Sequence, residues 1–224
     1  FDGVMRARAG ALTGILNGID TEVWNPAADP LLPAPFTAKA LAGKARAKRA
    51  ALEAFGVPVT DETLARPLVG LVSRLVDQKG FDLVAQVAES LLALGPGFVV
   101  LGSGDRRYEQ LWRHLAAIRP QQVGVHIGFD EAKAHLVEGG ADLFLMPSRY
   151  EPCGLNQMYS QRYGTVPVVR ATGGLVDSVV PWDPATKKGT GFLFAPYTGD
   201  AMLGALSEAL AVFGRPAEWR RLQQ

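Results

Sequence analysis

Residues 67–105 read PLVGLVSRLVDQKGFDLVAQVAESLLALGPGFVVLGSGD and contain two apolar runs separated by one amphipathic segment. The runs at residues 68–72 and 98–101 have the length and continuous apolar character of strands that are buried on both faces. Residues 81–94 have the length and spacing of an amphipathic helix. A strand, a helix and a second strand in this order indicate a parallel βαβ unit.

The same alternation continues to the end of the chain. Further strands are predicted at residues 123–127, 143–146, 166–169 and 192–194, and further helices at residues 105–118, 130–138, 155–163 and 200–213. The pattern therefore predicts an α/β fold: a Rossmann-like parallel sheet with helices on both faces.

The region before Pro67 has a different composition. Asn17-Gly18 is a turn signal and residues 24–35 are rich in Pro and Asp, so residues 1–35 are interpreted as an interdomain crossover or linker and residues 36–224 as the folded domain. Residues 36–55 are predicted to form a helix with a basic, solvent-facing side, made by Lys39, Lys44, Arg46, Lys48 and Arg49. Because the chain starts at Phe1 with no cap signal, we expect it to be truncated there.

Composition is that of an ordinary globular protein and excludes several classes of function. Of the 224 residues, 48% are hydrophobic and 20% charged, and 23 Lys and Arg against 22 Asp and Glu give a formal net charge of +1. This balance gives no broad reason to expect nucleic acid or an acidic membrane as a partner. A single cysteine, Cys153, and the absence of a secretory or membrane-spanning pattern favour a cytoplasmic protein.

Two cations follow the first predicted strand, in residues 73–80. In an open parallel sheet, ligands bind beyond the carboxyl ends of the strands. Arg74 and Lys79 lie five positions apart on a loop that opens a helix, where Arg can grip phosphate oxygens in pairs and Lys adds a point charge. These residues predict a diphosphate site, and the alternative is a surface loop with two unremarkable cations.

Glycines and an aromatic follow the next two strands. Residues 102–105, which include Gly104, would let the backbone approach a ligand closely, or would form a tight turn with Asp105 as a helix cap. Arg107 stands where a dinucleotide fingerprint needs its third glycine. Phe129 could stack on a base or staple the following helix.

Residues 147–157, after the fourth strand, place Glu151 beside a glycine that opens a helix. The carboxylate could accept hydrogen bonds from sugar hydroxyls or face positive charge at an anomeric carbon, and the alternative is a helix-capping role. Cys153 is not favoured as a nucleophile because no histidine lies near it in the sequence. Residues 172–174 form another glycine turn that could cap the same cleft.

The three histidines do not predict a metal site. His114, His126 and His135 are spaced too widely for a ligand set and are expected on helix surfaces or at a strand end. No metal or cofactor is therefore predicted.

Several motifs together resemble those of bacterial glycogen synthases and plant starch synthases, retaining glucosyltransferases with the two-domain GT-B fold. The resemblance covers nearly the whole chain, through residues 12–20 with 24–26, 73–80, 101–105, 147–155, 163–170 and 172–177. The run Glu-Pro-Cys-Gly-Leu at residues 151–155 is its most specific element. The chain would then be the C-terminal, donor-binding half of the enzyme.

The resemblance implies a role for each matching residue. Arg74 and Lys79 would hold the donor diphosphate, and Glu151 would lie at the transferred glucose. Phe129 would stack on adenine, where many members have Tyr. The residues around the sugar and distal phosphate would be Cys153, Gly154, Leu155 and Asn156. The wider GT-B pattern has two glutamates separated by seven residues, and this chain has Tyr159 at the second position, as the bacterial glycogen synthases do.

The implied activity is transfer of glucose from ADP-glucose, the donor substrate, to the non-reducing end of an α-1,4-glucan with retained configuration. The N-terminal acceptor domain, with its Lys-containing glycine loop, has no counterpart in these residues, so the chain itself is expected to bind donor and to be inactive. Two alternatives remain: another GT-B glycosyltransferase with a different nucleotide-sugar donor, and a non-catalytic nucleotide-binding module.

Overall fold

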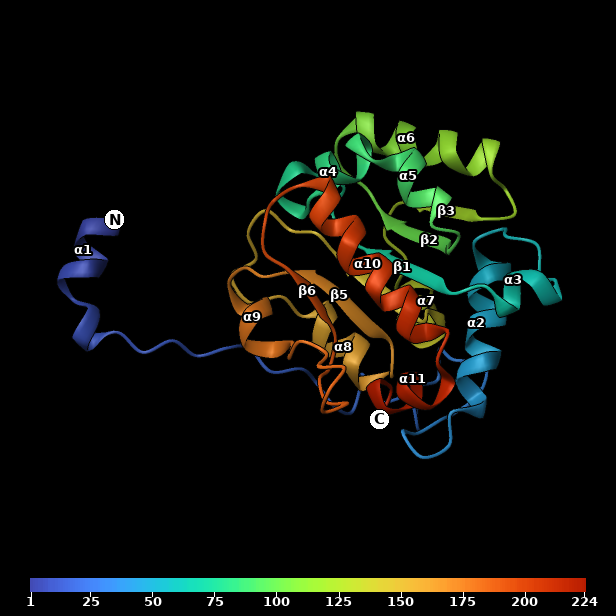
Figure 1. The fold of residues 1–224 in the computed structure, drawn as a ribbon, viewed down its shortest axis with the longest axis horizontal. Helices are drawn as coiled ribbons and strands as arrows, with labels where there is room; N and C mark the ends of the chain where they lie inside the picture. The colour runs from blue at the N-terminus through green and yellow to red at the C-terminus, as the bar shows by residue number, and fades with distance from the viewer.

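The computed structural model describes residues 1–224 and contains one sheet of six parallel strands (Figure 1). The order in the sheet is β3-β2-β1-β4-β5-β6, and every neighbouring pair is parallel. The strands are β1 (Leu68–Val72), β2 (Gly97–Gly102), β3 (Val123–Ile127), β4 (Leu143–Met146), β5 (Val166–Arg170) and β6 (Phe192–Phe194). The predicted α/β fold class is confirmed, and the strand order reverses direction between β1 and β4.

Helices cover both faces of the sheet. Before β1 the chain forms α1 (Asp2–Ala7), the 3-10 helix η1 (Ala9–Ala11), α2 (Ala42–Ala54) and α3 (Asp61–Ala65). From β1 onward it forms the 3-10 helix η2 (Asp77–Lys79), α4 (Phe81–Gln86), α5 (Ala88–Ala93), α6 (Arg106–Ile118), α7 (Glu131–Gly140), α8 (Asn156–Arg162), α9 (Gly174–Ser178), α10 (Gly199–Phe213) and α11 (Pro216–Leu222). No helix is long and apolar enough to cross a bilayer.

Alternate strand residues belong to two separate hydrophobic clusters, as the period of a strand requires. On one face, Val69 of β1 packs in a cluster with residues of α4, α5, α6 and α10, including the fully buried Trp112. On the other face, Leu68 packs with residues of α2, α7 and α9. Figure 1 shows α10 running across the sheet, with α6 and α5 above β2 and β3. Burial on both faces explains why the strand sequences are continuously apolar.

The predicted helix over residues 81–94 is divided into two. Val87 separates α4 from α5, with φ −121° and ψ 21°, values outside the helical region. Its side chain packs closely against Gly199 at the start of α10, where a Cβ atom would collide with it. Tertiary packing at this position therefore interrupts a sequence pattern that is helical throughout.

The predicted helix over residues 36–55 is shorter, and the expectation that its basic side chains all face solvent is wrong. The helix begins at Ala42, and Lys44 and Lys48 are buried, whereas Arg46 and Arg49 are exposed. Lys44 and Lys48 lie on the same helical stripe as Ala47, which is fully buried against α7. Small residues on this stripe bring the two helices close and enclose the lysines.

Residues 24–36 pack against the domain, while α1 stands apart from it at the end of an extended segment (Figure 1). The Trp24 ring is stacked between His135, at 4.0 Å, and Tyr159, at 3.8 Å between ring centroids. His135 is therefore buried and not on the helix surface as predicted. Asp29 accepts a hydrogen bond from the Tyr163 hydroxyl at 2.6 Å and contacts His135 Nδ1 at 2.7 Å. The division at residues 35 and 36 remains a prediction.

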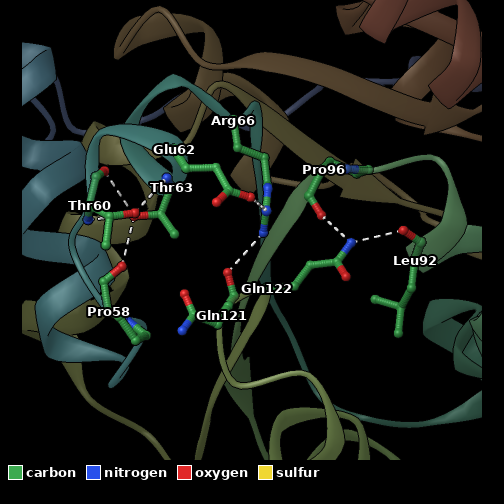
Figure 2. A network of polar contacts seen from close by, with 9 residues as sticks. All are labelled: Pro58, Thr60, Glu62, Thr63, Arg66, Leu92, Pro96, Gln121 and Gln122. Carbon is green, nitrogen blue, oxygen red and sulfur yellow. Dashed lines mark hydrogen bonds and ion pairs between the residues drawn. The ribbon is translucent and has the colours of Figure 1, made fainter.

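Polar contacts join the segments that precede β1, β2 and β3 (Figure 2). Thr60 and Thr63 form a reciprocal capping box at the start of α3. Arg66 donates to Glu62 at 2.6 Å and to the Gln121 carbonyl at 2.8 Å, and the Gln122 amide donates to the Leu92 and Pro96 carbonyls, each at 2.8 Å. These hydrogen bonds fix the chain where it enters this half of the sheet.

Candidate functional site

Two adjoining hollows lie at the carboxyl ends of the strands, beside the point where the strand order reverses. The first has a volume of about 200 Å³, and its polar lining residues are Ser73, Arg74, Lys79, Ser148 and Asn156. The second has a volume of about 390 Å³, and its lining residues include Gly102, Ser103, Gly128, Phe129 and Ala134. Val72, Ser73, Arg74 and Asn156 line both, so the two hollows form one cleft. This is the ligand position expected for a doubly wound sheet.

The loop after β1 is held against the loop after β4 by Gly80. Gly80 has φ 81°, a left-handed conformation that favours glycine, and a Cβ atom there would collide with the Pro147 carbonyl. The Arg149 N–H also donates to the Gln78 carbonyl at 2.9 Å. This close approach brings Lys79, from one loop, to Glu151, from the other.

Lys79, which lines the first hollow, forms an ion pair with Glu151. The Lys79 Nζ lies 2.5 Å from Glu151 Oε2, and Ser148 Oγ donates to the same oxygen at 3.2 Å. Glu151 is 7% exposed, and Oε1 has no hydrogen-bond partner within the chain. Glu151 does not itself line the hollows but contacts two residues that do. The helix-capping interpretation is wrong, since α8 begins at Asn156 with no side-chain cap.

Arg74 lies at the rim of the cleft and is available to a ligand. Its side chain is exposed, and its only hydrogen bond joins Nη2 to Gln78 Oε1 at 3.2 Å. The structure therefore does not bring Arg74 into contact with Lys79 or Glu151. Both cations line the first hollow, and Arg74 also lines the second.

The glycine turn after β2 packs against the loop after β1. A Cβ atom at Gly104 would collide with the Leu75 backbone, and the Gly104 N–H donates to Glu109 Oε1 at 2.9 Å. Gly104 does not line either hollow, although Gly102 and Ser103 line the second. Asp105 precedes α6, but its side chain makes no capping hydrogen bond. Within this turn, Gly104 allows the two loops to pack closely, and Gly102 and Ser103 line the cleft.

Phe129 lines the second hollow and is 88% exposed. It follows Gly128, which has φ 143°, and precedes Asp130, whose side chain caps α7 by accepting from the Lys133 N–H. An aromatic side chain exposed to this extent does not staple the next helix, so that alternative is wrong. Its ring face is available for stacking.

The segment from Cys153 to Leu155 does not line either hollow. Gly154 has φ 75°, and the Cys153 carbonyl accepts from the Gln157 side chain at 3.1 Å. The glycine turn after β5 packs on this segment: the Gly174 N–H donates to the Glu151 carbonyl at 3.1 Å, and a Cβ atom there would collide with Cys153. Roles for Cys153, Gly154 and Leu155 in ligand binding remain predictions.

Asn156 contacts a buried carboxylate that sequence reasoning missed. Its Nδ2 donates to Glu138 Oε1 at 3.2 Å, and Ser160 Oγ donates to Glu138 Oε2 at 2.7 Å. Glu138 is fully buried on α7, and burial raises its pKa to about 8. Nearby Lys44 is also buried, and burial lowers its pKa to about 7. The GGA run that follows Glu138 would have signalled close helix packing around it.

Arg170, at the end of β5, was also missed. Its guanidinium donates to the Arg149 carbonyl at 2.5 Å and, through Nε, to the Ala195 carbonyl at 3.3 Å. The guanidinium also lies over the Tyr197 ring, 5.1 Å from its centroid. Arg170 thereby fixes the loop that carries Glu151.

Comparison with known proteins gives a consistent result. The family model described as "Glycosyl transferases group 1" matches residues 57–220. The chain is 50% identical over 224 residues to a glycogen synthase of Koribacter versatilis, covering all of this chain and 46% of the relative. It is 55% identical over 222 residues to a glycogen synthase of Anaeromyxobacter dehalogenans, again covering 46% of the relative. The chain thus spans about half the length of the curated relatives it matches.

Solved structures show the same partial coverage. The catalytic domain of starch synthase IV from Arabidopsis thaliana, bound to ADP and acarbose, has a TM-score of 0.88 and 37% identity over 99% of this chain and 46% of its own. The C-terminal domain of a group 1 glycosyl transferase, LpcC, from Francisella tularensis has a TM-score of 0.63 and covers 92% of this chain and 93% of its own, at 14% identity that shows the fold alone.

These findings confirm the resemblance to glycogen and starch synthases and the likeness to one half of a GT-B glycosyltransferase. They agree with the cleft, which lies where a doubly wound sheet binds its ligand. The chain belongs to the group 1 glycosyl transferases.

Proposed function

We propose that the chain is the donor-binding part of a glycogen synthase, which transfers glucose from ADP-glucose to the non-reducing end of an α-1,4-glucan with retained configuration. Two comparisons support this function: the identity of about half to curated glycogen synthases, and the starch synthase structure that was solved with ADP and acarbose. The observation that carries the proposal is the Lys79–Glu151 pair beneath the cleft, with Arg74 at its rim.

The donor would lie in the cleft with its base in the second hollow, its diphosphate at the junction and its sugar near the first hollow. The exposed ring of Phe129 in the second hollow would stack on adenine, and Arg74 at the junction would meet the diphosphate. Lys79, which lines the first hollow, and its partner Glu151 would then lie at the distal phosphate and the glucose.

Each charged residue has a proposed task in the transfer. Arg74 and Lys79 would stabilise negative charge on the departing diphosphate, which is the role a divalent metal plays in other transferases, so we propose that none is required. Glu151 would accept from a sugar hydroxyl through Oε1, which is free, or face positive charge at the anomeric carbon. Cys153, Gly154, Leu155 and Gly104 would act by shaping the loops around the donor.

The activity belongs to a longer protein. We propose that the acceptor groove and the Lys-containing glycine loop come from an N-terminal domain of the same enzyme, which acts in the cytoplasm. The 224-residue chain would then bind ADP and transfer no glucose.

The test of the donor is calorimetric titration of the chain with ADP and with UDP. We expect binding of ADP that is tighter than binding of UDP. A UDP affinity equal to or above that of ADP would support the alternative of a different donor.

The test of the activity compares this chain with the longer protein. Glycogen elongation from ADP-glucose is expected only from the longer protein. If the longer protein binds ADP but transfers nothing to glycogen, the chain is a nucleotide-binding module and the proposal is wrong.

A further inference from the structure

Asn156 occupies the junction of the two hollows, and its side chain has only one hydrogen bond within the chain. It is the first residue of α8 and lines both hollows together with Ser73 and Arg74. One amide hydrogen on Nδ2 is directed to Glu138 Oε1 at 3.2 Å. The second amide hydrogen and the acceptor Oδ1 have no partner among the protein's hydrogen bonds.

Both side-chain oxygens of Glu138 are hydrogen-bonded to residues of α8. Oε1 accepts from Asn156, and Oε2 is hydrogen-bonded to the Ser160 hydroxyl, one helical turn further along the same face. The side chain is 0% exposed, so neither oxygen exchanges these partners for water. Since an amide group is planar, holding Nδ2 also fixes the direction of Oδ1.

A purely structural purpose does not account for this carboxylate. The charged group facing it from α2 is Lys44, whose Nζ donates to the Gly139 carbonyl at 3.0 Å, the Tyr163 carbonyl at 3.1 Å and Thr165 Oγ1 at 2.6 Å. Lys44 is thus satisfied without a hydrogen bond to Glu138. Replacement of buried ionic groups by apolar side chains of similar volume is often neutral or stabilising, so the stability of the fold does not by itself call for an ionisable side chain here.

We propose that Glu138 is a positioning residue for nucleotide binding: it holds one amide hydrogen of Asn156 and thereby aims the remaining donor and acceptor of that amide at a nucleoside diphosphate in the cleft. This rests on the proposed function of the cleft. Without the buried acceptor, the Asn156 amide rotates among several orientations, and binding has to select one of them.

The test measures ADP affinity by calorimetric titration of the 224-residue chain. Glu138→Met removes the acceptor at similar volume, and we expect a loss of affinity of about five-fold, the worth of one organised hydrogen bond. Glu138→Gln keeps an acceptor for Asn156 and places an amide toward Ser160, so its affinity is expected within about two-fold of the unsubstituted chain. Ser160→Ala, which leaves the Asn156 contact intact, serves as the matched control and is expected to behave like Glu138→Gln.

A double-substitution cycle separates positioning from general support of the fold. If Glu138 acts through Asn156, adding Glu138→Met to Asn156→Ala weakens ADP binding no further than Asn156→Ala alone. If the losses of ADP affinity from the two substitutions multiply in the double variant, the inference is overturned. Unchanged ADP affinity in Asn156→Ala would overturn it as well, and this measurement does not depend on whether Glu138→Met folds. Glu138→Ala offers a second removal of the acceptor. Absence of ADP binding by the unsubstituted chain would reject the proposed function itself, whereas ADP binding that ignores Glu138→Met rejects only the positioning role.

Discussion

The charged side chains at the carboxyl edge of the sheet differ from those buried beneath α2 in how fully the protein satisfies them. Arg74 at the cleft makes one long contact to Gln78 and is otherwise free. Lys48, beneath α2, donates to Asp142 and to the Arg66 carbonyl, both at 2.7 Å. A cation whose partners all belong to the fold stabilises the fold, and one whose donors are free is available to a ligand.

Glu138, on α7, and Glu151, in the loop after β4, differ in the same way in how fully the protein satisfies their hydrogen bonds. Both are buried, but Glu151 leaves Oε1 free beside the cleft, whereas both oxygens of Glu138 are occupied. The free oxygen of Glu151 fits the direct ligand contact that we propose for it, and the occupied oxygens of Glu138 fit the proposed indirect role. The following predictions test that division, beginning with the largest effect.

Lys48→Ala should destabilise the fold by about 3 kcal/mol or more, because it leaves the buried Asp142 carboxylate without its cation. Asp142 also accepts from the Leu68 N–H at 2.9 Å, so the start of β1 should loosen as well. Arg49→Ala, at an exposed position on the same helix, should change the unfolding free energy by less than about 0.5 kcal/mol. Urea unfolding measures the change in unfolding free energy for both variants. Equal changes would contradict the distinction between cations satisfied by the fold and exposed cations.

In the longer protein that we propose carries the activity, Arg74→Ala should reduce turnover by about a hundred-fold to a thousand-fold, through loss of the proposed charge stabilisation on the diphosphate. Its unfolding free energy should change by less than about 0.5 kcal/mol, since the side chain is exposed. Lys79→Ala should lose similar activity but also about 1–3 kcal/mol of stability, because Glu151 is then buried without its cation and keeps only the hydrogen bond from Ser148. Arg107→Ala, an exposed arginine bonded to Asp77 and outside both hollows, is the control and should retain full turnover.

Glu138 should make stability depend on pH, with a defined sign. Burial raises the pKa of folded Glu138 to about 8, above its value in the unfolded chain, so between about pH 5 and 7 the folded state holds a proton that the unfolded state has lost. The contribution is fully present below the unfolded pKa and is lost as pH rises toward 8, at up to about 1.4 kcal/mol per pH unit. Lys44, whose pKa is lowered to about 7, stays protonated in both states below that pH.

Glu138→Gln should remove this pH dependence. The measurement is the difference in unfolding free energy between Glu138→Gln and the unsubstituted chain at about pH 5, 5.5 and 6, where Lys44 stays protonated. A difference that stays constant across this range would show that Glu138 does not retain its proton.

The strands and the location of the site could be predicted from the sequence because both depend on local patterns. Strands buried on both faces give apolar runs whose ends are sharp, and residues 68–72, 123–127, 143–146 and 192–194 match the observed strands at both ends. Arg74, Lys79 and Phe129 were identified because a parallel sheet collects the loops after its strands at one edge.

The buried polar contacts could not be predicted because they depend on residues distant in the sequence. Lys44 reads as one of several basic residues on α2 until α7 and the end of α8 are placed against it, 95 and 119 residues later in the chain. His135 is enclosed by Trp24 and Asp29, and Glu138 by Asn156. A weak signal was present for Lys44 and Lys48, since their spacing places them on the stripe of small residues that packs against α7.

Phe129→Ala is expected to have the smallest effect, and it tests whether an exposed side chain that lines the cleft contacts a ligand. The ring is 88% exposed and belongs to no hydrophobic cluster, so its removal should leave the unfolding free energy unchanged within about 0.5 kcal/mol. Stacking on a base is worth about 1 kcal/mol at the lower end of its range, so ADP affinity should fall by about five-fold, while affinity for inorganic diphosphate stays the same. Phe129→Tyr preserves the ring face and should bind ADP as the unsubstituted chain does. Equal losses for ADP and inorganic diphosphate would mean that Phe129 shapes the loop and does not contact the base.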